Sequence, residues 1–308
     1  MRRLPKVVIT VALIALISAT ALFSVTLLSR AQELPEHLGI AYSSNESGNF
    51  NIYVLSPDGK RKRQLTDHPA DDLAPSWSSD GLLLAFTSDR DGNFEIYTMN
   101  AIDGSAVSRI TYTEQAESEP NWSPEMDKIA YVVETSAGKS HIAVLNLTSG
   151  EITLVTDSAS RNRSPAWSPD GKQIAFVSDR DGEPRIYLMD ADGSNQSPLF
   201  STPMMGDAPQ WSPDGTWIAF HSQQAGNAEI YRVRPNGEDL TRLTDAASAD
   251  MTPTWRPDGT RIIFSSDRDG NPQLYSMSLD GSDVVRLTEG AGDDFDPNCL
   301  WNLPSEGQ

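Results

Sequence analysis

The chain has 308 residues, 38% hydrophobic and 22% charged, which excludes both a disordered chain and a polytopic membrane protein. Its formal net charge is −19, and beyond the first 31 residues 43 acidic residues stand against 20 basic ones. Such an acidic surface repels phosphate backbones, which argues against nucleic acid as a partner. A single cysteine, Cys299, excludes an internal disulfide framework and a multi-cysteine metal site.

The N-terminus has the pattern of an export signal. Residues 1–6 are basic, and residues 7–28 carry no charge over 22 positions. The hydrophobic segment of a cleaved signal peptide has about 7–15 residues, and a membrane-spanning helix needs about 20. The length of this run therefore favours a signal anchor. Small residues at Ser29 and Ala31 leave cleavage near Ala31 as the alternative. Either way, the positive-inside rule predicts an exported, periplasmic or extracytoplasmic body that meets the membrane only through residues 7–28.

A repeat of about 44 residues fills the rest of the chain, and several markers share its phase. An apolar–Thr pair and an Ile-Tyr or Leu-Tyr pair recur in most copies. One aromatic series runs through a short apolar segment of each copy: Tyr42, Phe86, Tyr131, Phe176, Phe220 and Phe264. Six of the seven tryptophans follow at spacings of 44 to 46 residues: Trp77, Trp122, Trp167, Trp211, Trp255 and Trp301.

Each copy predicts four short strands. In residues 165–199, PAW, QIAFVS and RIYLM are short apolar strands, and a last strand reaches Leu199. SPDG, SDRDGEP and DADG between them are turn sequences, because proline presets φ and glycine accepts positive φ. Short strands with turn signals every 8–12 residues indicate an all-β protein, and a four-strand unit of this length is a propeller blade.

The number of units predicts a closed ring of six blades. Residues 39–66 supply three strands without a tryptophan strand, and residues 293–301 supply a tryptophan strand with nothing after it. Joined, the two fragments make a sixth blade and remove the open sheet edges. We therefore divide the chain into an export segment (1–31), a linker (32–38), a six-bladed β-propeller (39–301) and a tail (302–308). The complete units are 71–111, 116–156, 161–199, 206–244 and 249–288.

The repeat resembles that of the TolB-like propellers, also called the PD40 or WD40-like repeat. Residues 167–182 read W-S-P-D-G-K-Q-I-A-F-V-S-D-R-D-G, and residues 211–220 and 255–264 are close copies. The resemblance implies a bacterial envelope protein that binds other proteins, since the family prototype is a periplasmic member of a trans-envelope complex. The prototype carries an α/β domain before its propeller, which is absent from the expected layout here, so the resemblance does not extend to its specific role.

The candidate ligand site is a ring of polar residues five positions before each phased tryptophan. In one repeat this position is Gly206, and the acid follows it. Because this segment leads from an outer strand to the next innermost strand, we expect these side chains to circle one mouth of the central channel. Converging carboxylates repel unless a cation or a basic partner group offsets them. We call these residues the channel-mouth set: Asp72, Glu117, Asn162, Asp207, Asp250 and Asp296.

Enzyme chemistry finds little support in the sequence. No G-x-S-x-G or phosphate-binding glycine loop occurs, and the four histidines do not share a phase. The S-D-R-D-G loops lack the distant glutamate of a calcium loop, so we interpret them as hairpins. We expect no catalytic residue and no cofactor, with a divalent cation in the channel mouth as the one exception to test.

Three functions remain open from the sequence. The first is a non-enzymatic scaffold, monomeric in its propeller, that binds an envelope protein. The second is a cation- or carbohydrate-binding sensor that uses the acidic channel mouth. The third is a propeller hydrolase or lyase. The third blade (116–156) is the most degenerate, since Glu125-Met126 replaces Asp-Gly and Ile142-Ala143 replaces Ile-Tyr.

Overall fold

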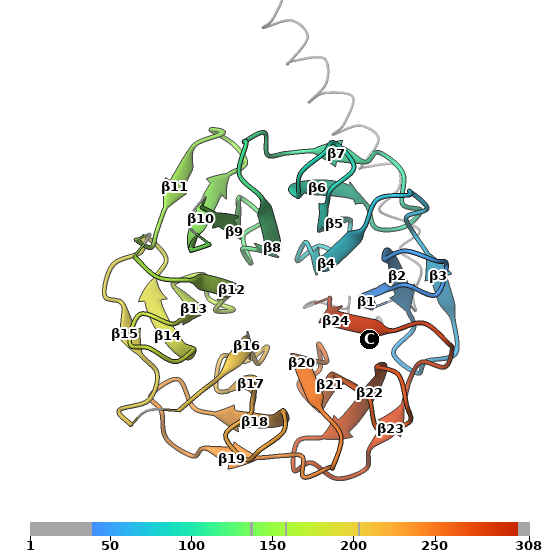
Figure 1. The fold of residues 1–308 in the computed structure, drawn as a ribbon, viewed down its shortest axis with the longest axis vertical. Helices are drawn as coiled ribbons and strands as arrows, with labels where there is room; N and C mark the ends of the chain where they lie inside the picture. Colours follow the sequence, from blue (N-terminus) through green and yellow to red (C-terminus); the bar gives the residue numbers. More distant parts are fainter. Residues whose placement is uncertain (1–38, 136–137, 158, 203, 301–308) are drawn as a thin grey trace, which may run out of the picture. The chain divides into compact units, whose positions relative to one another are not determined.

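The computed structural model describes residues 39–135, 138–157, 159–202 and 204–300. These residues form six four-stranded antiparallel sheets, arranged around a central axis with one strand of each sheet innermost (Figure 1). The predicted six-bladed all-β propeller is confirmed for these residues. The predicted N-terminal helix lies outside them, and within the described part of the chain no helix has the length and apolarity to span a bilayer.

We number the blades from the N-terminus and list their strands from the axis outward. Blade 1 contains β24 (Asp294–Cys299), β1 (Ile40–Ser44), β2 (Asn51–Leu55) and β3 (Lys62–Gln64). Blade 2 contains β4 (Asp72–Trp77), β5 (Leu83–Ser88), β6 (Glu95–Asn100) and β7 (Ser108–Arg109). Blade 3 contains β8 (Glu117–Trp122), β9 (Lys128–Glu134), β10 (Ser140–Asn146) and β11 (Ile152–Leu154).

The other three blades repeat this order. Blade 4 contains β12 (Asn162–Trp167), β13 (Gln173–Ser178), β14 (Arg185–Asp190) and β15 (Ser197–Pro198). Blade 5 contains β16 (Asp207–Trp211), β17 (Ile218–Ser222), β18 (Glu229–Val233) and β19 (Thr241–Arg242). Blade 6 contains β20 (Asp250–Trp255), β21 (Arg261–Ser266), β22 (Gln273–Ser278) and β23 (Val285–Arg286).

Blade 1 closes the ring from both ends of the described chain, as predicted. β24 pairs with β1 antiparallel, and Ile40 lies opposite Cys299. In blade 2 the corresponding pair is Leu84 opposite Trp77, so Cys299 takes the position that tryptophan holds in the other five blades. The assignment of Trp301 to this position was therefore wrong by two residues, because the closing strand ends before that tryptophan.

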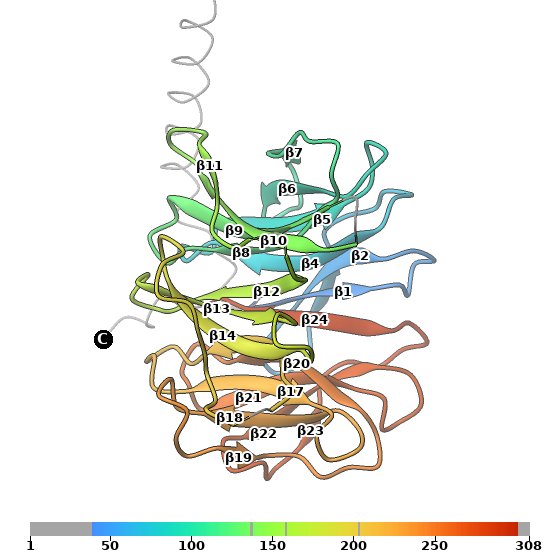
Figure 2. The same ribbon diagram turned by 60° about the vertical axis from the view of Figure 1, so that its left-hand side comes forward.

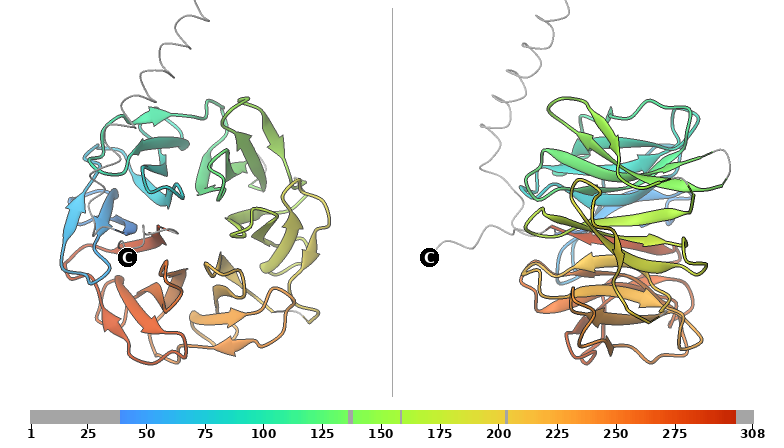
Figure 3. Two further views of the ribbon diagram at one scale, coloured as in Figure 1. Left: turned by 180° about the vertical axis from the view of Figure 1, so that it is seen from behind. Right: turned by 90° about the vertical axis from the view of Figure 1, so that its left-hand side faces the viewer.

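The hydrophobic core lies between blades. One cluster combines Val132 and Ile142 of blade 3 with Trp167 and Phe176 of blade 4, and the other junctions repeat this pattern. Because a neighbouring blade covers each face of a blade, the second strand is buried on both faces. In β13 of blade 4, four successive residues are 0% exposed: Ile174, Ala175, Phe176 and Val177. The turned views show the sheets packed side by side, with the connecting loops at the two rims (Figures 2 and 3).

The first turn of each blade follows the predicted chemistry. In blade 4, Gly171 has φ 68° and donates its N–H to the Ser168 carbonyl at 2.9 Å. The Ser168 hydroxyl donates to Asp170 at 2.7 Å, which fixes the turn from within. Blade 3 lacks the glycine, and Met126 adopts φ 60° in its place. A non-glycine residue there carries the cost of the left-handed conformation.

Candidate functional site

Each innermost strand contains a bulge that directs one residue to the propeller axis. This residue precedes a proline and has a left-handed backbone, with φ between 46° and 53°, although it is never glycine. The pairing of the innermost strand with the second strand shifts register around this point in every blade. Left-handed backbone is uncommon for non-glycine residues, and most uncommon for a β-branched residue such as Thr252. We call these six residues the axial ring: Ala74, Glu119, Ser164, Ala208, Thr252 and Asp296.

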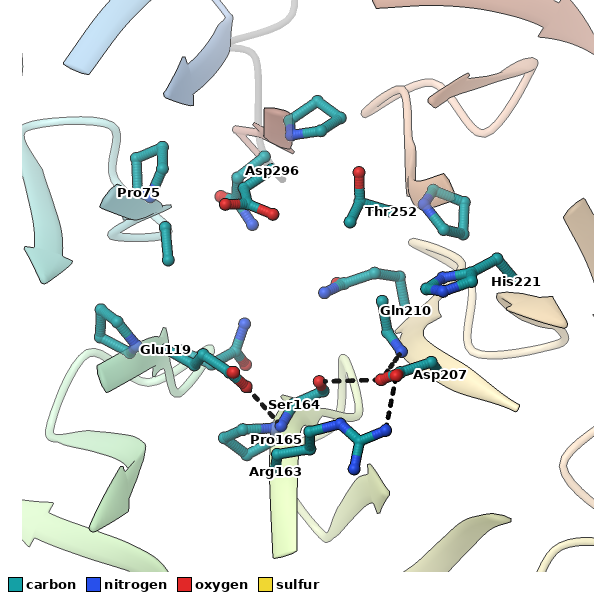
Figure 4. Close-up of a pocket in the computed structure, with 17 residues that line it drawn as sticks. Pro75, Glu119, Arg163, Ser164, Pro165, Asp207, Gln210, His221, Thr252 and Asp296 are labelled. Carbon is teal, nitrogen blue, oxygen red and sulfur yellow. Dashed lines mark hydrogen bonds and ion pairs between the residues drawn. The ribbon is translucent and has the colours of Figure 1, made fainter. Parts of the chain in front are cut away.

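The axial ring lines a cavity of about 300 Å³ on the propeller axis, to which every blade contributes (Figure 4). We call it the central cavity. Besides the ring and neighbouring prolines, its wall includes Arg163, Asp207, Gln210 and His221. Charge is distributed unevenly over the axial ring. Asp296 of blade 1 and Glu119 of blade 3 are acidic, whereas Ala74 of blade 2 and the ring residues of blades 4 to 6 are neutral. Three carboxylates and one guanidinium give the wall a net negative charge.

Two of the cavity carboxylates have partners. Arg163 Nη2 donates to Asp207 Oδ2 at 2.6 Å, and the Ser164 hydroxyl donates to Asp207 Oδ1 at 3.3 Å. Glu119 accepts the backbone N–H of Ser164 at 2.6 Å, across the junction of blades 3 and 4. The Asp296 carboxylate has no hydrogen-bond or ion-pair partner among the described residues, and it points into the cavity (Figure 4).

Burial shifts the pKa values of these groups. It raises the pKa of Asp296 to about 6, with no opposing charge. Burial also raises the pKa of Glu119, helped by the negative charges of Asp207 and Asp296 and opposed by the Ser164 N–H. The pKa of His221 is lowered by burial, so its ring is neutral at neutral pH. The cavity therefore contains carboxylates whose negative charge is costly to keep there, which a cationic group would relieve.

Two polar atoms of the wall are buried without a partner among the described residues. They are Nδ1 of His221 and Oγ1 of Thr252. A buried polar atom without a hydrogen bond costs free energy, and such atoms at a cavity wall are available to a ligand. The central cavity thus offers an anionic side and, across from it, neutral hydrogen-bonding groups.

The structure separates the channel-mouth set into two groups. Asp207 and Asp296 line the central cavity. The other four are fully buried at the first position of their strands and are not among its lining residues: Asp72, Glu117, Asn162 and Asp250. The expected ring of side chains at one mouth is therefore not formed, because these four lie two residues before the axial bulge. Asp296 joins the cavity only because β24 is offset by two residues from the phase of Trp301.

Three of these four buried residues have an arginine partner. Arg90 Nη2 donates to both oxygens of Asp72 at 2.8 and 2.9 Å, and Arg268 Nη2 donates to both oxygens of Asp250 at 2.9 Å. Arg180 Nη2 donates to Asn162 Oδ1 at 3.1 Å. Each arginine comes from an S-D-R-D-G loop, so these loops bind the strand that begins the same blade.

Sequence reasoning missed Glu119, Arg163 and His221 as cavity residues. A signal for the first was present, since a proline stands two positions before five of the six phased tryptophans and the residue before that proline is the axial one. Arg163 and His221 carry no repeated signal, because their positions hold apolar or other residues elsewhere. Within the described residues, no group of three or more His, Cys, Asp or Glu is placed to hold a metal ion.

The family model of the TolB β-propeller domain, PD40, matches residues 33–137, 120–203 and 196–302, which together span most of the chain. The chain belongs to this family. A Tol-Pal system protein TolB from Desulfosudis oleivorans is 40% identical over 58 residues, 19% of this chain and 13% of that protein. The curated relatives are thus matched over a small part of their length.

Solved structures extend the likeness of this TolB-like propeller to its whole ring. TolB from Acinetobacter baumannii superimposes with a TM-score of 0.77 at 23% identity, over 85% of this chain and 66% of that one. A putative TolB from Agrobacterium tumefaciens gives 0.69 at 25% identity, over 84% and 97%. An oligogalacturonate lyase in complex with manganese shares the fold at 0.57 and 18% identity, over 80% and 72%.

Proposed function

We propose that this chain is an exported, non-enzymatic interaction module of the bacterial cell envelope, and that its central cavity takes a positively charged segment of a partner protein. Membership of the TolB-like propeller family supports an envelope role, as does a relative named for the Tol-Pal system. The hydrophobic N-terminal run supports export, by an anchor or by cleavage.

One observation carries the proposal: Asp296 and Glu119 face a shared cavity, and no side-chain cation among the described residues pairs with either carboxylate. A lysine or arginine side chain would neutralise them and recover the cost of their burial. A cavity of about 300 Å³ admits such a side chain and the adjoining backbone, but not a folded domain. The partner would therefore present an extended or terminal segment.

The decisive experiment is affinity capture of the full-length chain from the detergent-solubilised envelope of its own cell, identified by mass spectrometry. We expect an envelope protein that is retained by the wild-type chain and lost with Glu119→Gln/Asp296→Asn. The matched control is Glu151→Gln/Glu289→Gln, which removes the same charge at exposed sites. Capture that is equal for both double variants, repeated at low salt, would reject the cavity as the binding site.

A second candidate is a ligand sensor, favoured by the unpartnered His221 and Thr252 atoms in the same wall. A ligand that binds only the folded chain raises its melting temperature. A thermal-shift series with calcium, magnesium, manganese and neutral or acidic sugars tests this directly. A cation or neutral sugar that stabilises the wild-type chain but not Glu119→Gln/Asp296→Asn would favour the sensor. The net negative wall disfavours an acidic sugar.

A further inference from the structure

Among the described residues, the junction between blades 2 and 3 pairs two buried carboxylates with one cation. Glu95 begins β6 of blade 2, Glu117 begins β8 of blade 3, and both are 0% exposed. Arg109 forms an ion pair with Glu95, and the Thr111 hydroxyl donates to Glu95 at 2.7 Å. Glu117 accepts a hydrogen bond from the Thr113 hydroxyl at 2.9 Å, but its Oε2 is buried without a partner among the described residues.

The junction between blades 5 and 6 is the same cluster with a second cation. Glu229 matches Glu95: Arg242 donates to it at 2.8 Å and the Thr244 hydroxyl at 2.6 Å. Asp250 matches Glu117, since each begins the next innermost strand, and each donates its backbone N–H to the residue just before the glutamate of the preceding blade. Here Arg268 neutralises Asp250, so two buried acids meet two arginines.

Blade 3 has lost the second arginine together with its surroundings. Glu117 pairs with Val133 as Asp250 pairs with Ser266, so Thr135 stands where Arg268 stands in blade 6. Arg268 lies 4.8 Å from the ring of Tyr275 and donates to the Ser266 hydroxyl. Blade 3 has Val133 in place of that serine. It has Ala143 in place of that tyrosine, since Ala143 pairs with Tyr131 as Tyr275 pairs with Phe264. An arginine in this loop would therefore lack both its platform and its anchor.

A proton can take the place of the lost cation. The charged or titratable groups that face Glu117 are Glu95 and Arg109 from blade 2 and Tyr131 from its own blade, while His141 is bound to the Thr156 carbonyl in the next junction. Burial raises the pKa of Glu117 to about 7, and the neighbouring Glu95 carboxylate adds to the shift. A proton on this pair of carboxyl groups would supply the positive charge that Arg268 supplies in the matched junction.

We propose that the junction of blades 2 and 3 is a proton-sensitive latch, in which the Glu95–Glu117 pair holds the blades together when protonated and loosens them when the proton leaves. Above neutral pH the pair carries two buried negative charges, and Arg109 is the one cation among the described residues that is paired with it. The latch does not depend on what the central cavity binds. It concerns β8, whose third residue is Glu119 of the cavity wall.

Hydrogen exchange of the full-length chain at pH 6 and pH 8, corrected for the intrinsic pH dependence of amide exchange, tests the latch within one molecule. We expect amides of residues 112–122 to lose protection by at least about tenfold at pH 8, the equivalent of one pKa unit. Residues 245–255 of the matched junction should not change. Equal pH responses at the two junctions would overturn the proposal.

Two variants make the assignment specific. Glu117→Gln keeps the hydrogen bond from Thr113 and should abolish the difference between pH 6 and pH 8. Glu95→Gln removes the repulsion while keeping Glu117, and should reduce the difference as well. The Glu95→Gln variant keeps the test valid if Glu117→Gln does not fold, and near-ultraviolet circular dichroism shows whether each variant is folded. The matched control, Glu229→Gln, should leave the difference intact. A wild-type pH response in a folded Glu117→Gln or Glu95→Gln chain would overturn the latch.

Discussion

Arg268 lies 4.8 Å from the ring of Tyr275 and donates from Nη2 to both carboxylate oxygens of Asp250, at 2.9 Å each. The arginine comes from the second hairpin of blade 6 and the aspartate from the start of its innermost strand. The pair therefore holds the loop of a blade to the strand nearest the axis. Asp250 is completely buried, so its charge depends on this one guanidinium.

Removal of Arg268 should be one of the more damaging single substitutions in the chain. Arg268→Met keeps the aliphatic contact but leaves Asp250 buried and unpaired, which should lower the free energy of unfolding at pH 7 by about 3 kcal/mol. Urea unfolding at pH 7 measures the loss. Arg63→Met, at an exposed position, should change stability by less than about 0.5 kcal/mol.

The first turn of blade 3 should be improved by glycine. Met126 has φ 60° and is 38% exposed, whereas the corresponding Gly81, Gly171 and Gly215 have φ between 68° and 72°. Met126→Gly removes the left-handed strain but increases the freedom of the unfolded chain, so we expect a net gain of about 0.5–1 kcal/mol, or about 2 °C in melting temperature. Differential scanning calorimetry measures the shift. The reverse change, Gly171→Ala, should cost about 1 kcal/mol, and an unchanged or lower melting temperature for Met126→Gly would contradict the strain argument.

Asp296 should show a conflict between stability and binding. Its pKa is raised to about 6 in the folded chain, so folding favours the protonated form. Stability therefore falls as the pH rises from about 4 to about 6 and stays lower above that. Asp296→Asn mimics the neutral form and should be more stable than wild type by about 2 kcal/mol at pH 8, with no difference near pH 4. Chemical unfolding across this range measures the gap, and a gap independent of pH would contradict the assignment.

The fold could be predicted from the sequence because its signals repeat. Turn glycines, phased tryptophans and the aromatic series each occur several times, so an irregular copy does not obscure the period. The one error of phase came from Trp301. Its spacing matched the series, whereas Cys299, which holds the tryptophan position of the closing strand, does not resemble the repeated marker. Closure by β24 was still predicted, because the two end fragments complement each other.

The candidate site was harder to predict because the axial position lies two residues further along the strand than the acids that the sequence singled out. An ideal strand alternates its side chains, and nothing in the sequence around Asp72 distinguishes a buried position from an axial one. The bulge before each proline changes the alternation and directs Glu119 and Asp296 to the axis. Arg163 and His221 stand at positions that vary from blade to blade, so the repeat carries no signal for them.

The irregular third blade is explained as one connected change rather than several. Ala143, Val133 and Thr135 replace the ring, the hydroxyl and the guanidinium that act together in blade 6. Once the tyrosine platform is lost, the arginine has no surface on which to lie, and the acid it paired with must be protonated or exposed. The sequence showed the first of these losses, but only the pairing register relates all three to Glu117.

Cys299 should report the opening of the ring. It is 2% exposed on the closing strand, and burial raises the pKa of its thiol to about 12, so in the native chain it is neither accessible nor ionised. We expect it to react with a thiol reagent at pH 8 at least about a thousandfold more slowly than in urea, because reaction requires β24 to leave β1. The Cys299→Ala/Ser149→Cys variant, with its thiol on an exposed turn, should react at once in both conditions. A native Cys299 that reacts as fast as this control would show that the N- and C-terminal strands do not hold the propeller closed.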